Sequence, residues 1–211
     1  MAKFLITGPK DAPVRFLCAH GAGKGMESPF LDKIAELLGE RGIAVWRFEF
    51  AYMAARQDGG SRKPPPKAER LMDEYRAAVA ELPRGGPILI GGKSMGGRVA
   101  SMIADELFGE RRIAGLVCLG YPFHPPKAPE KLRTAHLEAM ACPALIVQGE
   151  RDPFGTRAEV EAFRLSSAIR LHWAGDGDHD LGPRGASGFT RKGNLTAAAD
   201  AIAEFAASVA R

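Results

Sequence analysis

The sequence predicts an α/β fold with a mostly parallel central sheet flanked by helices on both faces. Short apolar runs that are typical of buried strands recur along the chain, and stretches with helical spacing lie between most of them. This alternation favours a parallel sheet, because a helix usually connects parallel strands. The apolar runs are residues 14–18, 44–48, 88–90, 116–119, 144–147 and 169–173. The helical stretches are residues 29–38, 68–82, 99–107, 156–163 and 194–209.

The size and composition of the chain indicate one globular domain over residues 1–211. A chain of 211 residues is long enough for one domain with a substantial core, and too short for two ordinary domains plus a linker. Hydrophobic residues make up 45% and charged residues 26%, which is typical of globular domains. The net charge of +4 is spread along the chain without a concentrated basic face, so we expect no nucleic-acid partner.

Cysteine usage and the apolar segments favour a cytoplasmic protein without a membrane partner. Cys18, Cys118 and Cys142 lie in or beside apolar runs, and an odd number of cysteines cannot form a complete disulfide framework. We therefore predict reduced thiols in the core. The chain reaches Gly8 before a signal-peptide apolar region has formed, and no later apolar run is long enough to span a bilayer.

The most informative motif is Gly-x-Ser-x-Gly at residues 92–96, with Ser94 at its centre. In such a nucleophile elbow a strand turns sharply into a helix, and the runs at 88–90 and 99–107 supply that strand and helix. One alternative is a glycine-rich helix start that Ser94 only caps. Another is the end of a phosphate-binding P-loop, which is not favoured because Pro87 stands where the first glycine of that loop is required.

A serine nucleophile needs a base and an acid, and the order that accompanies this elbow is serine, acid, histidine. Asp152 follows the apolar run at 144–147, and His179 lies in a glycine-containing loop after the run at 169–173. The alternatives are that Asp152 only caps the next helix, with Glu150 as the acid, and that His179 is a solvated loop residue. The other histidines lack the required order or position: His20, His124, His136 and His172.

The negatively charged oxygen of a tetrahedral intermediate needs backbone N–H donors, one from the residue after the nucleophile and one from the loop after an earlier strand. Met95 and Ala22 occupy these positions. Ala22 belongs to the glycine-containing segment at residues 20–23, for which a simple strand-ending turn is the alternative. We predict that these two residues form an oxyanion hole.

On these motifs the chain resembles the α/β-hydrolase superfamily over nearly its whole length, in its small, lidless, dienelactone-hydrolase-like region. More narrowly, residues 120–126, 148–155 and 176–180 resemble the KANL/Tex-type branch, whose members are described as predicted hydrolases and in some eukaryotes serve in protein complexes. The resemblance implies a serine hydrolase that cleaves an ester, thioester or lactone through an acyl-enzyme on Ser94. The alternative is an interaction module with a protein partner and little or no turnover.

The same reasoning gives expectations for the substrate. The segment between residues 119 and 144 is brief and Pro-rich, so we expect an open pocket without a large cap and a small-molecule acyl substrate. Cations near the predicted active edge suggest an anionic substrate, although charged loops are also common on solvated surfaces. We predict no metal and no cofactor. The predicted substrate-binding residues are Lys93, His124 and Lys63, and Arg56, Arg62 and Lys67 are further cations of the same region.

Overall fold

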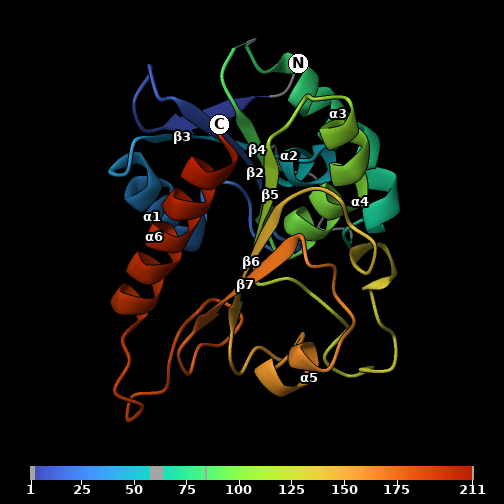
Figure 1. Cartoon of the computed structure of the whole chain (residues 1–211), viewed down its shortest axis with the longest axis vertical. Coiled ribbons are helices and arrows are strands. Elements are labelled where there is room, and N and C mark those ends of the chain that lie inside the picture. The colour runs from blue at the N-terminus through green and yellow to red at the C-terminus, as the bar shows by residue number, and fades with distance from the viewer. Residues whose placement is uncertain (1–2, 58–63, 84, 211) are drawn as a thin grey trace.

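The computed structural model describes residues 3–57, 64–83 and 85–210 and contains a seven-stranded sheet with helices on both faces (Figure 1). The strand order is β1-β3-β2-β4-β5-β6-β7, and only β1 runs antiparallel to its neighbour, β3. The fold class predicted from the sequence is therefore confirmed. The strands are β1 (Phe4–Thr7), β2 (Val14–Ala19), β3 (Ile43–Phe48), β4 (Ile88–Lys93), β5 (Gly115–Leu119), β6 (Ala144–Gly149) and β7 (Ile169–Ala174).

The helices form two layers, with α1 and α6 on one face of the sheet and α3 and α4 on the other (Figure 1). Successive residues of β2 face opposite layers: Phe16 packs with the α1 and α6 side, and Leu17 with the α3 and α4 side. The helices are α1 (Pro29–Gly39), α2 (Ala51–Gln57), α3 (Met72–Glu81), α4 (Met95–Gly109), α5 (Arg157–Glu161) and α6 (Arg191–Val209), with 3-10 turns η1 (Ala68–Leu71) and η2 (Ala135–Leu137).

All the predicted strands and helical stretches are present, with two additions and one subdivision. β1 is a short edge strand, and its half-exposed residues lack the buried character that identified the other strands. α2 lies between β3 and η1, where the sequence pattern predicts no helix, and with 7 residues it is too short to show helical periodicity. The stretch at 68–82 divides into η1 followed by α3.

Tyr75 of α3 supports the strand that leads into the motif at residues 92–96. The tyrosine is fully buried, and its hydroxyl accepts a hydrogen bond from the N–H of Gly91 at 2.8 Å. The same hydroxyl lies 2.7 Å from the carbonyl oxygen of Gly91 and 2.9 Å from that of Leu17. It therefore satisfies polar groups of β2 and β4 inside the core.

The connection from β5 to β6 contains no large cap. Between residues 119 and 144 the chain forms irregular structure and the 3-10 turn η2, which confirms the prediction from its length and proline content. Among the described residues, no helix has both the length and the apolar character that crossing a bilayer requires.

Candidate active site

Ser94 stands at the sharp turn between β4 and α4. Its backbone has φ 50° and ψ −113°, a strained conformation for a residue that is not glycine. The Ser94 N–H donates a hydrogen bond to the carbonyl oxygen of Leu119, at 2.9 Å, which ties the turn to the end of β5. Ser94 is half-buried and lines the surface at the carboxyl edge of the sheet.

The two glycines of the motif are required by the closeness of β2. A Cβ atom at Gly92, where φ is +150°, would lie 2.2 Å from the carbonyl oxygen of Ala19. A Cβ atom at Gly96 would lie 2.6 Å from that oxygen and 2.6 Å from the carbonyl oxygen of His20. Larger residues would therefore push the turn away from the sheet.

The structure brings Asp152 and His179 into direct contact. The Oδ2 atom of Asp152 lies 2.7 Å from Nδ1 of His179, and Asp152 is fully buried. A carboxylate only accepts hydrogen bonds, so this contact assigns the proton of neutral His179 to Nδ1 and leaves a lone pair on Nε2. The ring of Phe154 packs on the imidazole with 4.4 Å between ring centroids, which further fixes its orientation.

Two further contacts hold the Asp152 carboxylate. The side chain of Gln148 donates to Oδ2 at 3.0 Å, and the N–H of Phe154 donates to Oδ1 at 2.9 Å. Sequence reasoning did not include Gln148, although a polar side chain at the end of an otherwise apolar strand is a recognisable signal. Asp152 is not the cap of α5, because Thr156 and Glu159 form a capping box there.

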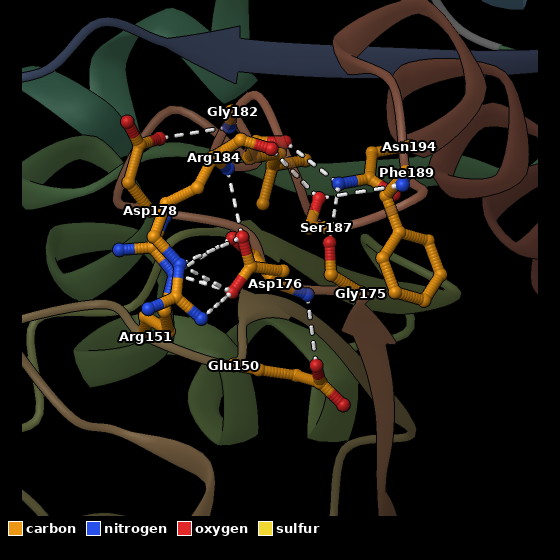
Figure 2. Close-up of polar contacts among 11 residues, drawn as sticks. Glu150, Arg151, Gly175, Asp176, Asp178, Gly182, Arg184, Ser187, Phe189 and Asn194 are labelled. Carbon is orange, nitrogen blue, oxygen red and sulfur yellow. Dashed lines mark hydrogen bonds and ion pairs between the residues drawn. The ribbon is translucent and has the colours of Figure 1, made fainter.

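The alternative acid, Glu150, has a different role in the loop that carries His179 (Figure 2). Its side chain accepts a hydrogen bond from the N–H of Asp176 at 2.8 Å and pairs with Arg157 at 2.9 Å. Asp176 in turn binds Arg184 at 2.6 Å and Arg151 at 2.9 Å. The hydrogen bonds from Arg184 lower the pKa of Asp176 to about 2.

Asp178 and Asn194 complete the support of this loop (Figure 2). The carboxylate of Asp178 accepts hydrogen bonds from the N–H groups of Asp180 and Gly182, at 2.9 and 2.8 Å. Asn194, from α6, donates to the carbonyl oxygens of Gly175 and Leu181 at 3.0 and 2.9 Å. His179 is therefore presented by a loop that is fastened at both ends, and the alternative of a solvated loop residue does not fit these contacts.

Lys93 borders one of the hollows at Ser94, and its charge is already paired. Its ammonium group donates to the carbonyl oxygen of His179 at 2.8 Å and pairs with Asp180 at 3.3 Å. It also lies 5.3 Å from the centre of the Phe30 ring, and its side chain is only 9% exposed. Burial lowers the pKa of Lys93, and the charge of Asp180 opposes this shift. Lys93 therefore fastens the loop of His179.

The other predicted substrate-binding residues lie elsewhere or fall outside the described residues. His124 is 3% exposed, its ring lies 3.5 Å from Glu159, and it lines neither of the two hollows described below. The structure therefore does not bring His124 to the site. Arg56 stacks over the ring of Tyr52 at 5.1 Å. Lys63 and Arg62 lie outside the described residues.

The loop that carries Ala22 is held from two sides. His20 is fully buried; its Nε2 accepts a hydrogen bond from the N–H of Phe50 at 3.2 Å, and its Nδ1 lies 2.6 Å from the carbonyl oxygen of Gly21. Burial lowers the pKa of His20 to about 4, so the ring is neutral at pH 7. The Tyr52 hydroxyl donates to the carbonyl oxygen of Ala22 at 3.1 Å.

Ala22 borders the same hollows as Ser94, and Met95 begins α4 directly after Ser94. Within the described part of the chain, the backbone N–H groups of Ala22 and Met95 donate no hydrogen bond. Both are thus free to donate to a bound oxygen.

Two hollows meet at Ser94. The small hollow has a volume of about 290 Å³ and the large hollow about 530 Å³. Ser94, Ala22 and Phe154 border both of them. The small hollow is otherwise lined by Gly21, Gly23, Lys24, Ser28, Phe30, Lys93, His179 and Asp180. The large hollow is otherwise lined by Pro65, Pro66, Lys67, Ala68, Glu69, Met95, Arg98, Pro122 and Arg133.

Comparisons with known proteins agree with this architecture. Dienelactone hydrolase from Anabaena variabilis superposes with a TM-score of 0.72 and 24% identity, covering 100% of this chain and 93% of that one. Est1E from Butyrivibrio proteoclasticus, in a structure with ferulic acid bound, gives 0.68 and 17%, covering 99% and 95%. A serine hydrolase without a lid from Xanthomonas campestris gives 0.61 and 18%, covering 85% and 81%. Because a family model described as an alpha/beta hydrolase domain matches residues 12–207, the chain belongs to that family.

Proposed function

We propose that this protein is a serine hydrolase that cleaves ester, thioester or lactone bonds through an acyl-enzyme on Ser94. The observation that carries the proposal is the 2.7 Å contact between His179 and the fully buried Asp152, beside the hollow that His179 shares with Ser94. The resemblance to a dienelactone hydrolase and to Est1E supports this reaction class.

In the proposed reaction, the Ser94 hydroxyl attacks the carbonyl carbon while Nε2 of His179 takes the hydroxyl proton. Asp152 holds the imidazole through Nδ1 and stabilises its protonated form. The N–H groups of Ala22 and Met95 stabilise the negatively charged oxygen. His179 then gives its proton to the leaving oxygen or sulfur, and water, activated by His179, releases the acid and regenerates Ser94.

The open surface around Ser94 favours short acyl groups. As lined by the described residues, the two hollows are open and form no enclosed apolar tunnel of the kind that a long chain needs, and the β5–β6 connection supplies no cap over them. We therefore propose a small-molecule acyl substrate and expect p-nitrophenyl butyrate to be cleaved with a higher kcat/KM than p-nitrophenyl palmitate. A strong preference for the long chain would contradict this proposal.

The mechanism is tested with a fluorophosphonate probe and with p-nitrophenyl butyrate. Ser94→Ala should abolish labelling and lower kcat/KM by at least about 10³-fold while the protein stays folded, since removal of a triad member leaves only binding and the oxyanion hole. Ser208→Ala is the matched control, because this serine lies in α6 and bonds to the carbonyl oxygen of Phe205. Folded parent protein that neither labels nor hydrolyses the ester would contradict the proposal and favour the interaction module.

A cytoplasmic location is proposed as well. Cys18, Cys118 and Cys142 are free and buried, and burial raises the pKa of Cys18 and Cys142 to about 12. Buried protonated thiols of this kind fit a reducing compartment. Localisation of the tagged protein by cell fractionation would test this.

A further inference from the structure

The large hollow beside Ser94 has an excess of positive charge. Of the residues that the structure describes, three cations line it, Lys67, Arg98 and Arg133, against one carboxylate, Glu69. Glu69 pairs with Arg98 at 2.8 Å. Among the described residues, no carboxylate pairs with Arg133 or Lys67. The hollow therefore presents one paired and two unpaired positive charges next to the proposed nucleophile.

Arg133 is held in place through its backbone. Its N–H donates to the carbonyl oxygen of Phe123 at 2.8 Å, and its own carbonyl oxygen accepts a hydrogen bond from the Tyr121 hydroxyl at 3.0 Å. Both aromatic residues are fully buried. The guanidinium therefore extends from a rigid support, which reduces the entropy that ligand binding would cost.

The surroundings of Arg133 disfavour its charged form. Burial lowers the pKa of Arg133, and the nearby charge of Arg98 lowers it further. The side chain of Arg98 is only 20% exposed, and its buried Nε has no hydrogen-bond partner in the described part of the chain. An anion in the hollow would offset the repulsion between the two guanidinium groups.

The position of His179 determines which part of the substrate enters the large hollow. The leaving oxygen must receive its proton from His179, and His179 lines the small hollow but not the large one. The leaving group therefore lies on the side of the small hollow. The acyl chain, on the other side of the carbonyl carbon, extends into the large hollow.

We propose that the large hollow binds a carboxylate at the far end of the acyl chain, with Arg133 as its ligand, while the paired Arg98 contributes positive potential beside it. This inference rests on the proposed function and specifies its substrate class: short esters or thioesters of dicarboxylic acids. The planar guanidinium group of Arg133 matches the geometry of a carboxylate, and Lys67 adds a charge at the exposed side of the hollow.

The test compares two probes with the same glutaryl chain, p-nitrophenyl hydrogen glutarate and its neutral methyl ester, after subtraction of spontaneous hydrolysis. The parent should prefer the anionic probe in kcat/KM. Arg133→Gln should lower the ratio of anionic to neutral kcat/KM by about tenfold, as expected for the loss of a charged hydrogen bond. Equal rates for the two probes in the parent would overturn the inference while leaving the proposed hydrolase function intact.

Two control variants locate the charge effect. Lys131→Gln removes a charge from an exposed residue of the same connection and should leave the ratio within about twofold of the parent value. Lys24→Gln removes a charge from the small hollow. If Lys24→Gln lowers the ratio and Arg133→Gln does not, the acyl carboxylate lies in the small hollow and the assignment is wrong.

A binding measurement separates this inference from turnover. In the Ser94→Ala variant, ligand-observed NMR should detect monomethyl glutarate but not dimethyl glutarate at equal concentration. The double variant Ser94→Ala/Arg133→Gln should lose the signal of monomethyl glutarate, with its fold checked by circular dichroism. Equal binding of both compounds to Ser94→Ala would contradict the inference even if no ester proves to be a good substrate.

Discussion

Both sides of Ser94 carry basic residues, and two of these, Lys93 and Arg133, differ in whether their charges are paired. Lys93, on the side of the small hollow, pairs with Asp180 and with the carbonyl oxygen of His179. Arg133, on the side of the large hollow, has backbone partners but no carboxylate among the described residues. Of these two cations, Arg133 is therefore the one expected to bind an anion.

This difference shows that closeness to a nucleophile does not identify a substrate-binding cation. The sequence places Lys93 directly before Ser94, which suggests a contact with an anionic substrate. In the structure the charge of Lys93 stabilises the loop of His179, whereas Arg133, from the β5–β6 connection, lines the large hollow beside Ser94. The partners of a charge decide its role, and those partners depend on the fold.

The largest expected effect lies on the side of the small hollow. Asp152→Asn should lower kcat by about 10³- to 10⁴-fold for the anionic and the neutral glutarate probe alike, because an amide no longer holds the Nδ1–H tautomer of His179. The ratio between the two probes should stay as in the parent. The measurement is steady-state release of p-nitrophenol by folded protein.

Glu150→Gln is the matched control, because Glu150 is the alternative acid in the sequence and contacts Asp176 and Arg157 instead of His179. Its expected loss of kcat is below about tenfold, an indirect effect through the loop. A larger loss in Glu150→Gln than in Asp152→Asn would reverse the assignment of the acid.

A smaller effect concerns the pH dependence of stability and involves His20, which holds the loop of Ala22 between the two hollows. The folded state lowers the pKa of His20 to about 4, below its usual value near 6.5, so the unfolded chain binds more protons between these pH values. The stabilising effect is complete above about pH 6.5 and is lost as the pH falls toward about 4. Between about pH 7.5 and 4.5, the parent should lose about 2 to 3 kcal/mol more free energy of unfolding than His20→Gln.

Urea unfolding at both pH values measures this difference, and an NMR titration of the parent provides a check that needs no variant. A His20 ring that titrates near its usual value would show that the segment carrying Ala22 does not depend on a neutral histidine.

Lys93→Met should lower kcat by about tenfold for both glutarate probes, because the loop of His179 loses the ammonium that binds its backbone. The ratio of anionic to neutral kcat/KM should stay within about twofold of the parent, since the charge of Lys93 is already paired. Lys93→Met should thus lower kcat, whereas Arg133→Gln should lower the ratio of anionic to neutral kcat/KM. A loss of the anionic preference in Lys93→Met would remove the distinction between the two sides of Ser94.

The sequence was sufficient for the elements whose signals are local. The buried runs predict six of the seven strands, and the Gly-x-Ser-x-Gly pattern predicts the strained turn at Ser94. The chain order serine, acid, histidine also selects the pair Asp152 and His179, which the structure places 2.7 Å apart. These signals depend on composition and short spacing, which a single sequence contains.

Roles that depend on contacts made only in the folded chain could not be predicted from the sequence. Lys93 contacts a residue 86 positions later, so its partner could not be inferred from its neighbours. Arg133 lies in irregular structure whose course is set by contacts with Phe123 and Tyr121. Gln148 gains its importance only because Asp152 folds back onto it at 3.0 Å. Tertiary contacts assign each of these roles.

The smallest expected effect is a change with salt in the ratio of anionic to neutral kcat/KM, which should depend on Arg133 and not on Lys93. Mobile ions screen an exposed charge more than a buried pair, and the Debye length falls from about 10 Å at 0.1 M to about 3 Å at 1 M. The large hollow opens to solvent, so its attraction for the glutarate carboxylate should weaken, and the ratio of anionic to neutral kcat/KM should fall by about threefold over this range. In Arg133→Gln the effect of salt on this ratio should be smaller, because less attraction for the carboxylate remains. In Lys93→Met the effect of salt should match that in the parent, because the paired ammonium of Lys93 contributes little to this attraction. If salt changes the ratio equally in Arg133→Gln and the parent, the preference arises from the net charge of the protein and not from the large hollow.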